Sequence, residues 1–464
     1  MDRTTFLDQL GASMGAVDSW VRGFGDFERD ETMAVDAATT GSIINDLTER
    51  LRDNYPFEHP RYAGQMVKPP HPIAVLSYAT TMLLNPNNHA LDGGPATSAM
   101  EREVVESLAQ MFGYDQHLGH LTGGGTVANL EALWVARSLH PGKRIVASDQ
   151  AHYTHSRLSE VIGVPFGAVR TDQHGRMDLN ALEDELRTGD VGTVVATAGT
   201  TGLGSVDPVH EILRLARQYG ARVHVDAAYG GFFRLLAGSD SPLVDPAPFL
   251  AIAESDSVVV DPHKHGLQPY GCGSVMFSDP SVGRFYVHDS PYTYFTSDDL
   301  HLGEISLECS RAGATAAALW STLRALPLES DRGFGPIVAK CRRAALEWAR
   351  VISASERFRL VVEPDLDILT FYPVPVGKRV RASSISRLTD EVFRRTMTSD
   401  IDRVYLAKLI VRRELLGEVD RSIEWDEPMV TMLRSVLMKP EHLEFVPTLH
   451  GSVEQALHDA EGGK

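Results

Sequence analysis

Short hydrophobic runs alternate with amphipathic segments through the middle of the chain. The hydrophobic runs are rich in Val and Ala, and they cover residues 144–148, 192–198, 221–227 and 256–261. Runs of this length, bounded by turn residues, are typical of strands that are buried on both faces of a parallel sheet. The pattern therefore predicts four buried parallel strands.

Amphipathic segments flank these runs. Hydrophobic residues recur at three- and four-residue spacing in residues 98–112, 129–139, 181–189 and 208–220, and Gly220 closes the last segment. This spacing is typical of helices that bury one face, and glycine commonly follows a helix C-terminus. Strands that alternate with helices predict an α/β domain with a mostly parallel sheet.

The pattern changes toward both ends of the chain. Residues 1–58 are mixed and polar, with helical spacing in parts, and predict an N-terminal helical arm. Residues 59–330 form the predicted large domain, which begins with Pro-rich loops around a helix at 73–84 and ends with a long helix at 311–325. Residues 331–464 combine helical and strand-like segments and predict a smaller C-terminal α+β domain.

Composition narrows the possible partners and the compartment. The chain has 62 acidic and 44 basic residues and a formal net charge of −18, which repels nucleic-acid phosphates and anionic membranes. We therefore expect neither nucleic acid nor a membrane as a partner, and no stretch has the length of a membrane span. The three cysteines are far apart and lack metal-ligand spacing, which predicts no metal site and a reducing, cytoplasmic location.

Chemistry-bearing residues follow the ends of the predicted strands, where ligands bind in open α/β sheets. The glycine-rich turn at 120–129, HLTGGGTVAN, precedes a helix and could cradle an anion, although such turns are often only tight turns. Asp226 ends one strand, and a buried aspartate needs a partner. Lys264 follows another strand between His263 and His265, where a lysine is more often a surface charge. Together these groups match pyridoxal phosphate, which needs a phosphate cup, a carboxylate for its pyridine nitrogen and a lysine.

The motifs around Asp226 and Lys264 make this match specific. The segments HVDAAYGG and DPHK resemble the two most diagnostic motifs of the group II pyridoxal-phosphate-dependent amino-acid decarboxylases. The resemblance extends from about residue 55 to residue 325 and more thinly to the C-terminus. It implies the aspartate-aminotransferase-like fold type I, with pyridoxal 5'-phosphate (PLP) bound in the large domain. It also implies a homodimer with shared active sites, for which Met66, Phe295 and the arm at 1–58 are candidate contacts.

The resemblance also implies a role for each matched residue. Lys264 would bind the cofactor as a Schiff base, and Asp226 would bond its pyridine nitrogen. His152 would stack on one face of the ring and Ala228 would pack on the other. The remaining cofactor contacts implied by the match are Gly125, Thr126 and His263 at the phosphate and, more weakly, Thr201. His265 receives no role.

A tyrosine-containing segment at 290–295, SPYTYF, lies where the family carries a mobile catalytic loop. The resemblance makes Tyr292 the residue that returns a proton to Cα of the substrate, with Tyr294 as the alternative. Outside this family, two tyrosines in an exposed loop would more often be packing residues. A phenylalanine at this position would have indicated an oxidative, aldehyde-forming relative.

The substrate is less well determined by the sequence. HPRYAGQM (59–66) resembles the glutamate- and cysteine-sulfinate-type enzymes and makes Gln65 a substrate-binding candidate, although Gly64 replaces their asparagine. Arg434 matches an arginine that binds a substrate carboxylate in the glutamate enzymes. The alternative, that Arg434 is an ordinary arginine on a surface helix or strand pair, accounts for this position about as well. ECSRAGATAAALW (308–320) is instead similar to archaeal tyrosine/aspartate decarboxylases and sphingosine-phosphate lyases. We expect decarboxylation of an L-amino acid with a polar or acidic side chain, such as glutamate or aspartate, to the amine and CO₂.

Three alternatives stay open at this point. The first is an aromatic L-amino-acid decarboxylase acting on tyrosine or tryptophan. The second is a PLP-dependent carbon–carbon lyase or aldehyde synthase of the same fold. The third is a non-catalytic scaffold, against which the intact Lys264, Asp226 and His152 argue.

Overall fold

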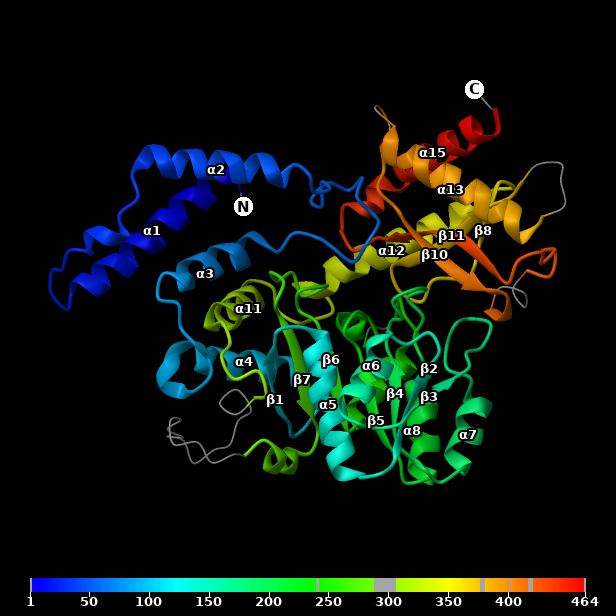
Figure 1. Ribbon diagram of the computed structural model, residues 1–464, viewed down its shortest axis with the longest axis horizontal. Coiled ribbons are helices and arrows are strands. Elements are labelled where there is room, and N and C mark those ends of the chain that lie inside the picture. Colours follow the sequence, from blue (N-terminus) through cyan, green and yellow to red (C-terminus); the bar gives the residue numbers. More distant parts are fainter. Residues whose placement is uncertain are drawn as a thin grey trace.

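The computed structural model describes residues 2–238, 242–287, 306–375, 380–399, 401, 403–415 and 420–462. Two sheets organise these residues, a seven-stranded sheet in the lower body and a four-stranded sheet above it (Figure 1). No helix of these ranges combines the length and hydrophobicity needed to cross a membrane.

The seven-stranded sheet has the strand order β1-β7-β6-β5-β4-β2-β3. Neighbouring strands from β6 to β3 pair in parallel, and β7 pairs antiparallel with both β1 and β6. The mostly parallel α/β prediction is confirmed. The strands are β1 Leu118–Thr122, β2 Arg144–Ser148, β3 Phe166–Val169, β4 Val191–Thr197, β5 Arg222–Asp226, β6 Ser257–Val260 and β7 Gly273–Phe277.

Helices cover both faces of this sheet. Successive residues of β2 show the two faces, because Ile145 belongs to a buried cluster with Leu133 and Leu158, and Val146 belongs to a different buried cluster. The four predicted strands β2, β4, β5 and β6 are buried on both sides, as their continuous hydrophobic runs predict, whereas the edge strand β3 is partly exposed. The helices of this domain are α4 Pro95–Phe112, α5 Gly125–Leu139, α6 Thr154–Val161, α7 Leu179–Arg187, α8 Val209–Gln218, α9 Pro246–Leu250 and α11 Gly313–Ala325.

The second sheet is antiparallel, with the order β10-β11-β9-β8. Helices pack on it around Trp348, Phe371 and Leu433, which are fully buried. The strands of this sheet and the helices around it are α12 Phe334–Ala354, β8 Phe358–Leu360, β9 Ile368–Pro373, α13 Ala382–Thr398, β10 Ala407–Arg412, β11 Met429–Val436 and α15 His442–Gly462. The predicted domain limits at 58 and 330 stay a prediction.

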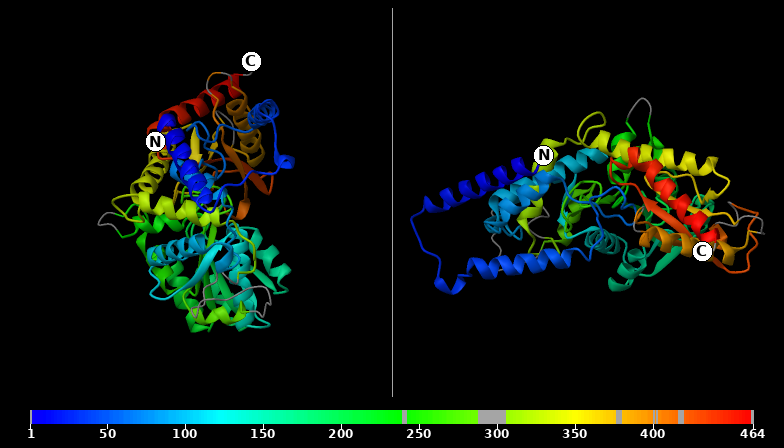
Figure 2. Two further views of the ribbon diagram at one scale, coloured as in Figure 1. Left: turned by 90° about the vertical axis from the view of Figure 1, so that its left-hand side faces the viewer. Right: turned by 90° about the horizontal axis from the view of Figure 1, so that it is seen from above.

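The N-terminal helices project away from the rest of the molecule (Figures 1 and 2). Helices α1 (Arg3–Arg22) and α2 (Ala37–Leu51) contain no buried residue. Helix α1 contacts α3 (Pro72–Met82), where the hydroxyls of Ser13 and Thr80 lie 2.8 Å apart. This arm leaves much hydrophobic surface uncovered.

Candidate active site

A cavity of about 320 Å³ opens where β4, β5 and β6 end and α5 begins. This is the edge of the sheet at which α/β proteins bind their ligands. The cavity wall includes most of the residues singled out from the sequence, although they are distributed over about 140 positions of the chain. These residues are Gly125, Thr126, His152, Thr201, Asp226, Ala228, His263 and Lys264.

Lys264 enters the cavity from the turn after β6. Its Nζ lies 3.0 Å from Oδ2 of Asp261, the residue that directly follows the strand. Asp261 is buried, and its Oδ1 has no hydrogen-bond partner within the described ranges. A buried carboxylate thus holds the lysine amine at the cavity wall.

Asp226 is the last residue of β5 and is held by two donors. Its Oδ1 accepts from the backbone N–H of Ala228 at 3.1 Å, and its Oδ2 accepts from Nε2 of His155 at 2.8 Å. Burial alone would raise the pKa of Asp226, but the hydrogen bond from His155 and the positive charge of Lys264 bring this pKa well below its ordinary value. Asp226 is therefore an anion at neutral pH.

The glycine-rich turn brings backbone to the cavity at the N-terminus of α5. Gly124 has φ +148°, a conformation that favours glycine. A Cβ on Gly125 would lie 2.7 Å from Oδ2 of Asp261, so only glycine fits here without displacing that carboxylate. The start of a helix carries free N–H groups and a positive partial charge, so this wall suits an anion such as a phosphate.

Two histidines that are distant in the sequence, His152 and His263, line the cavity. Nδ1 of His152 lies 2.7 Å from the hydroxyl of Thr154, which fixes the ring, and burial lowers the pKa of His152. The ring of His263 packs against Tyr270 with centroids 4.8 Å apart. Burial lowers the pKa of His263 as well. Both imidazoles are therefore predominantly neutral at neutral pH.

The two predicted substrate residues lie together behind the cavity wall. The guanidinium of Arg434, on β11, donates to the carbonyl oxygens of Thr201 and Gly202 at 2.6 and 3.0 Å. Its Nη1 lies 3.5 Å from Oε1 of Gln65, which is exposed. Arg434 is buried, which corrects the alternative of a surface arginine, and neither it nor Gln65 lines the cavity itself. Tyr292, Tyr294 and Phe295 lie outside the described residues.

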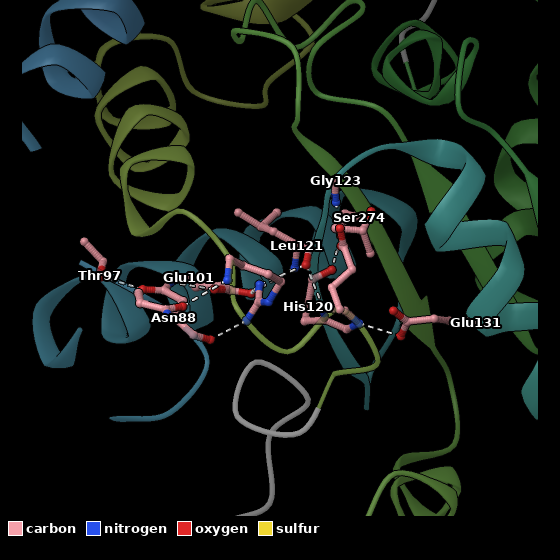
Figure 3. A network of polar contacts seen from close by, with 12 residues as sticks. Asn88, Thr97, Glu101, His120, Leu121, Gly123, Glu131 and Ser274 are labelled. Carbon is pink, nitrogen blue, oxygen red and sulfur yellow. Dashed lines mark hydrogen bonds and ion pairs between the residues drawn. The ribbon is translucent and has the colours of Figure 1, made fainter. Parts of the chain in front are cut away.

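A buried polar network holds the strand that leads into the glycine-rich turn (Figure 3). Glu101 pairs with Arg311 and accepts from the backbone N–H of Leu121 at 3.0 Å, while Arg311 donates to the Leu121 carbonyl at 2.9 Å. On the other side of β1, Nε2 of His120 lies 2.7 Å from Glu131. The network fixes Leu121 near the end of β1, two residues before Gly123, the first glycine of the turn.

Three residues in or near the cavity received no role from the sequence, namely Asp261, His155 and His265. Asp261 contacts Lys264, and His155 contacts Asp226. His155 had a signal in the sequence, because it follows His152 by three residues at the start of a helix. His265 does not line the cavity; its Nε2 lies 3.1 Å from Oδ2 of Asp367. The hydroxyl of Tyr229 donates to the other oxygen of Asp367 at 2.5 Å. His265 thus lies against Asp367, the residue just before β9, although Nε2 of His265 and Oδ2 of Asp367 are not in hydrogen-bond geometry.

The cavity fits pyridoxal phosphate on its own chemistry. The Asp226 anion suits a protonated pyridine nitrogen, the Lys264 amine suits the aldehyde, and the start of α5 suits the phosphate. Three buried polar atoms of cavity-lining residues also have no partner within the described ranges and could bind such a ligand. They are Oγ1 of Thr197, Oδ1 of Asp261 and Nδ1 of His263.

Comparisons with known proteins give the same cofactor. The family model described as the pyridoxal-dependent decarboxylase conserved domain matches residues 27–373. An L-tyrosine decarboxylase of Enterococcus faecium is 28% identical over 86% of this chain and 85% of its own length. A probable L-aspartate decarboxylase of Pyrococcus abyssi is 29% identical over 71% of this chain and 83% of its own. The structure of Oryza sativa TDC with PLP and tryptamine has the same fold, with a TM-score of 0.78, 16% identity and 99% of each chain covered.

Proposed function

The chain belongs to the pyridoxal-dependent decarboxylase family and is a PLP-dependent amino-acid decarboxylase, and we propose that its substrate is an L-amino acid with a polar or acidic side chain, such as aspartate or glutamate. The products would be the corresponding amine and CO₂. The similar proteins do not choose the side chain, because the tyrosine and aspartate decarboxylases match this chain about equally well. The choice therefore depends on the chain's own residues.

The buried guanidinium of Arg434 is the observation that carries this proposal. Its partners are neutral oxygens, those of Thr201, Gly202, Gly64 and Gln65, and no carboxylate lies within ion-pair distance among the described residues. A buried cation without a paired anion attracts a carboxylate that comes near it. Because Thr201 lines the cavity, Arg434 is one residue behind the wall that a substrate side chain would approach. An acidic side chain would be favoured there over an aromatic one.

We propose that the cavity residues hold PLP in the way the family motifs imply. Lys264 would bind the cofactor through its amine, Asp226 would face the pyridine nitrogen, and His152 and Ala228 would pack on the two ring faces. Gly125, Thr126 and His263 would hold the phosphate, with Thr201 close by. When bound, PLP supplies an electron sink for the electron pair that remains after the bond to CO₂ breaks.

The protein's own groups would control the proton movements. Asp261 holds the Lys264 amine at the cavity wall until the cofactor is bound. Tyr292 would deliver the proton to Cα, with Tyr294 as the alternative, and both lie outside the described residues. A tyrosine hydroxyl is a suitable general acid once the site is closed to water.

We also propose that two copies of the chain associate through the N-terminal arm. Hydrophobic side chains on α1 and α2 are about half exposed, among them Trp20 at 57% and Ile43 at 58%. A monomer rarely leaves so large a hydrophobic surface uncovered, and a second copy would bury it. Analytical ultracentrifugation would give a dimer for the wild type and a monomer for a double variant with Ile44→Asp and Leu47→Asp. A monomeric wild type would refute the dimer.

The substrate proposal is tested by comparing kcat/KM for L-aspartate, L-glutamate and L-tyrosine. Arg434→Lys should lower kcat/KM for the preferred acidic substrate by about a hundredfold, because a precise charged contact is lost. The exposed Arg343→Lys on α12 is the matched control and should change nothing. A wild type that prefers tyrosine, or an Arg434→Lys variant with unchanged acidic activity, would contradict the proposal.

A further inference from the structure

The imidazole of His155 lies directly behind the carboxylate of Asp226. Its Nε2 is 2.8 Å from Oδ2 of Asp226, and the His155 side chain has no exposed surface. His155 comes from the first turn of α6 and does not line the cavity. Its side chain therefore reaches a bound ligand through Asp226, the cavity residue to which it is hydrogen-bonded.

The surroundings of the second ring nitrogen, Nδ1, decide which nitrogen of His155 carries the proton. Nδ1 of His155 has no hydrogen-bond partner within the described part of the chain. A proton on Nδ1 would be a buried donor without an acceptor, which is costly. The proton therefore sits on Nε2, where it is donated to Asp226, and the carboxylate keeps its negative charge.

The second oxygen of Asp226 is held independently. Oδ1 accepts from the backbone N–H of Ala228 at 3.1 Å, so the carboxylate is fixed at both oxygens. The other buried histidine nearby, His224, is fully engaged elsewhere, because its two nitrogens lie 2.8 Å from Asn129 and Ser257. Among the described side chains, His155 is thus the one that donates to Asp226.

We propose that His155 is a positioning residue that keeps Asp226 ionised and aimed at the pyridine nitrogen of PLP. The inference depends on the proposed placement of Asp226 opposite that nitrogen. One helix start would then serve the cofactor twice, because His152 faces the cavity and His155 supports the carboxylate three residues later. Partners behind a contacting residue commonly set its orientation and its basicity.

The test measures the cofactor rather than the reaction. Holoenzyme loaded with PLP labelled with ¹⁵N at the ring nitrogen is examined by solid-state NMR at pH 7.5, and the Kd of PLP is measured by dialysis. His155→Leu should shift the ring nitrogen toward its unprotonated signal and raise the Kd about tenfold or more. His155→Gln keeps an N–H near the position of Nε2 and should lie closer to the wild type. Ser159→Ala, on the same helix and also fully buried, is the control and should match the wild type.

Two further measurements keep the outcome decisive. In wild-type protein with ¹⁵N-labelled histidine, His155 should carry its proton on Nε2, and a proton on Nδ1 alone would overturn the inference even if His155→Leu fails to fold. Asp226→Asn separates the two proposals. If Asp226→Asn leaves the ring nitrogen protonated, the placement of Asp226 is wrong. If Asp226→Asn removes that proton and His155→Leu does not, only the role of His155 is wrong.

Discussion

The Nζ of Lys264 lies 3.0 Å from Oδ2 of Asp261, and the same carboxylate lies beneath Gly125 at the start of α5. One buried acid therefore connects the lysine that would bind the cofactor with the turn that would hold its phosphate. Both ends of the cofactor site are fixed by the residue that follows β6. Changes at any of these three positions should therefore affect cofactor binding.

Lys264→Ala should remove the covalent link to the cofactor and lower kcat by at least about a thousandfold, because the amine is the proposed attachment point. Borohydride reduction followed by peptide mass spectrometry should find the cofactor on the peptide that contains Lys264. The exposed Lys340→Ala is the control and should keep both the labelled peptide and the activity. Labelling at another lysine of the wild type would refute this assignment.

Asp261→Asn should destabilise the apoprotein more than the holoenzyme. It removes the charge that pairs with the partly buried Lys264 amine, and leaving such a charged group without its partner costs about 1–3 kcal/mol. Bound PLP consumes the amine and should reduce this cost. Urea unfolding of both forms measures the difference, and an equal loss in the two forms would show that the ion pair is not what Asp261 contributes.

Gly125→Ala should weaken PLP binding by about tenfold or more, since its Cβ would lie 2.7 Å from Oδ2 of Asp261 and must displace either that carboxylate or the turn. Gly451→Ala provides the comparison, because a Cβ there meets nothing within 4 Å and alanine favours the surrounding helix α15. Equilibrium dialysis of PLP gives the Kd of each variant. Unchanged binding in Gly125→Ala would mean that this glycine does not shape the phosphate wall.

His224 should make the protein less stable as the pH falls below 6.5. Burial lowers the pKa of His224 to about 3, so between about pH 6.5 and 3 its imidazole binds a proton in the unfolded chain but not in the folded protein. The free energy of unfolding then falls with pH, by about 1.4 kcal/mol per unit for this residue.

Urea unfolding of the wild type and His224→Gln at pH 7.0 and 5.5 isolates this contribution. The stability advantage of the wild type should shrink by about 1–2 kcal/mol at the lower pH, because glutamine does not titrate. An advantage that is constant or grows at pH 5.5 would show that His224 is not kept neutral by burial.

The sequence predicts the parallel strands well because their hydrophobic runs are continuous. β2 has the predicted limits, and β4, β5 and β6 differ from their predictions by one residue at each end. β1, β3 and β7 were not predicted. LGHLT, FGAV and GSVMF are short and contain glycine, and β1 also contains His120, so their hydrophobic pattern is weak. Their strand structure depends on pairing with neighbours that are distant in the chain.

The cavity residues were predictable for a different reason. Gly125 begins a helix, Asp226 ends a strand and Lys264 follows a strand, each in a recognisable motif, so their positions follow from the fold. The roles of Asp261 and His155 depend on which side chain each one meets, and that is set by packing between segments far apart in the sequence. Arg434 shows the same limit, since only the three-dimensional contact with Thr201 distinguishes a buried cation from a surface one.

Product analysis tests the central claim most directly. The PLP-loaded protein is incubated with each common L-amino acid, and amine, aldehyde and CO₂ are followed by mass spectrometry. We expect amine and CO₂ in equal amounts from aspartate or glutamate, and no product from tyrosine or tryptophan at comparable rates. Aldehyde in place of amine, or amine from the aromatic amino acids alone, would contradict the account of a decarboxylase selected for an acidic side chain.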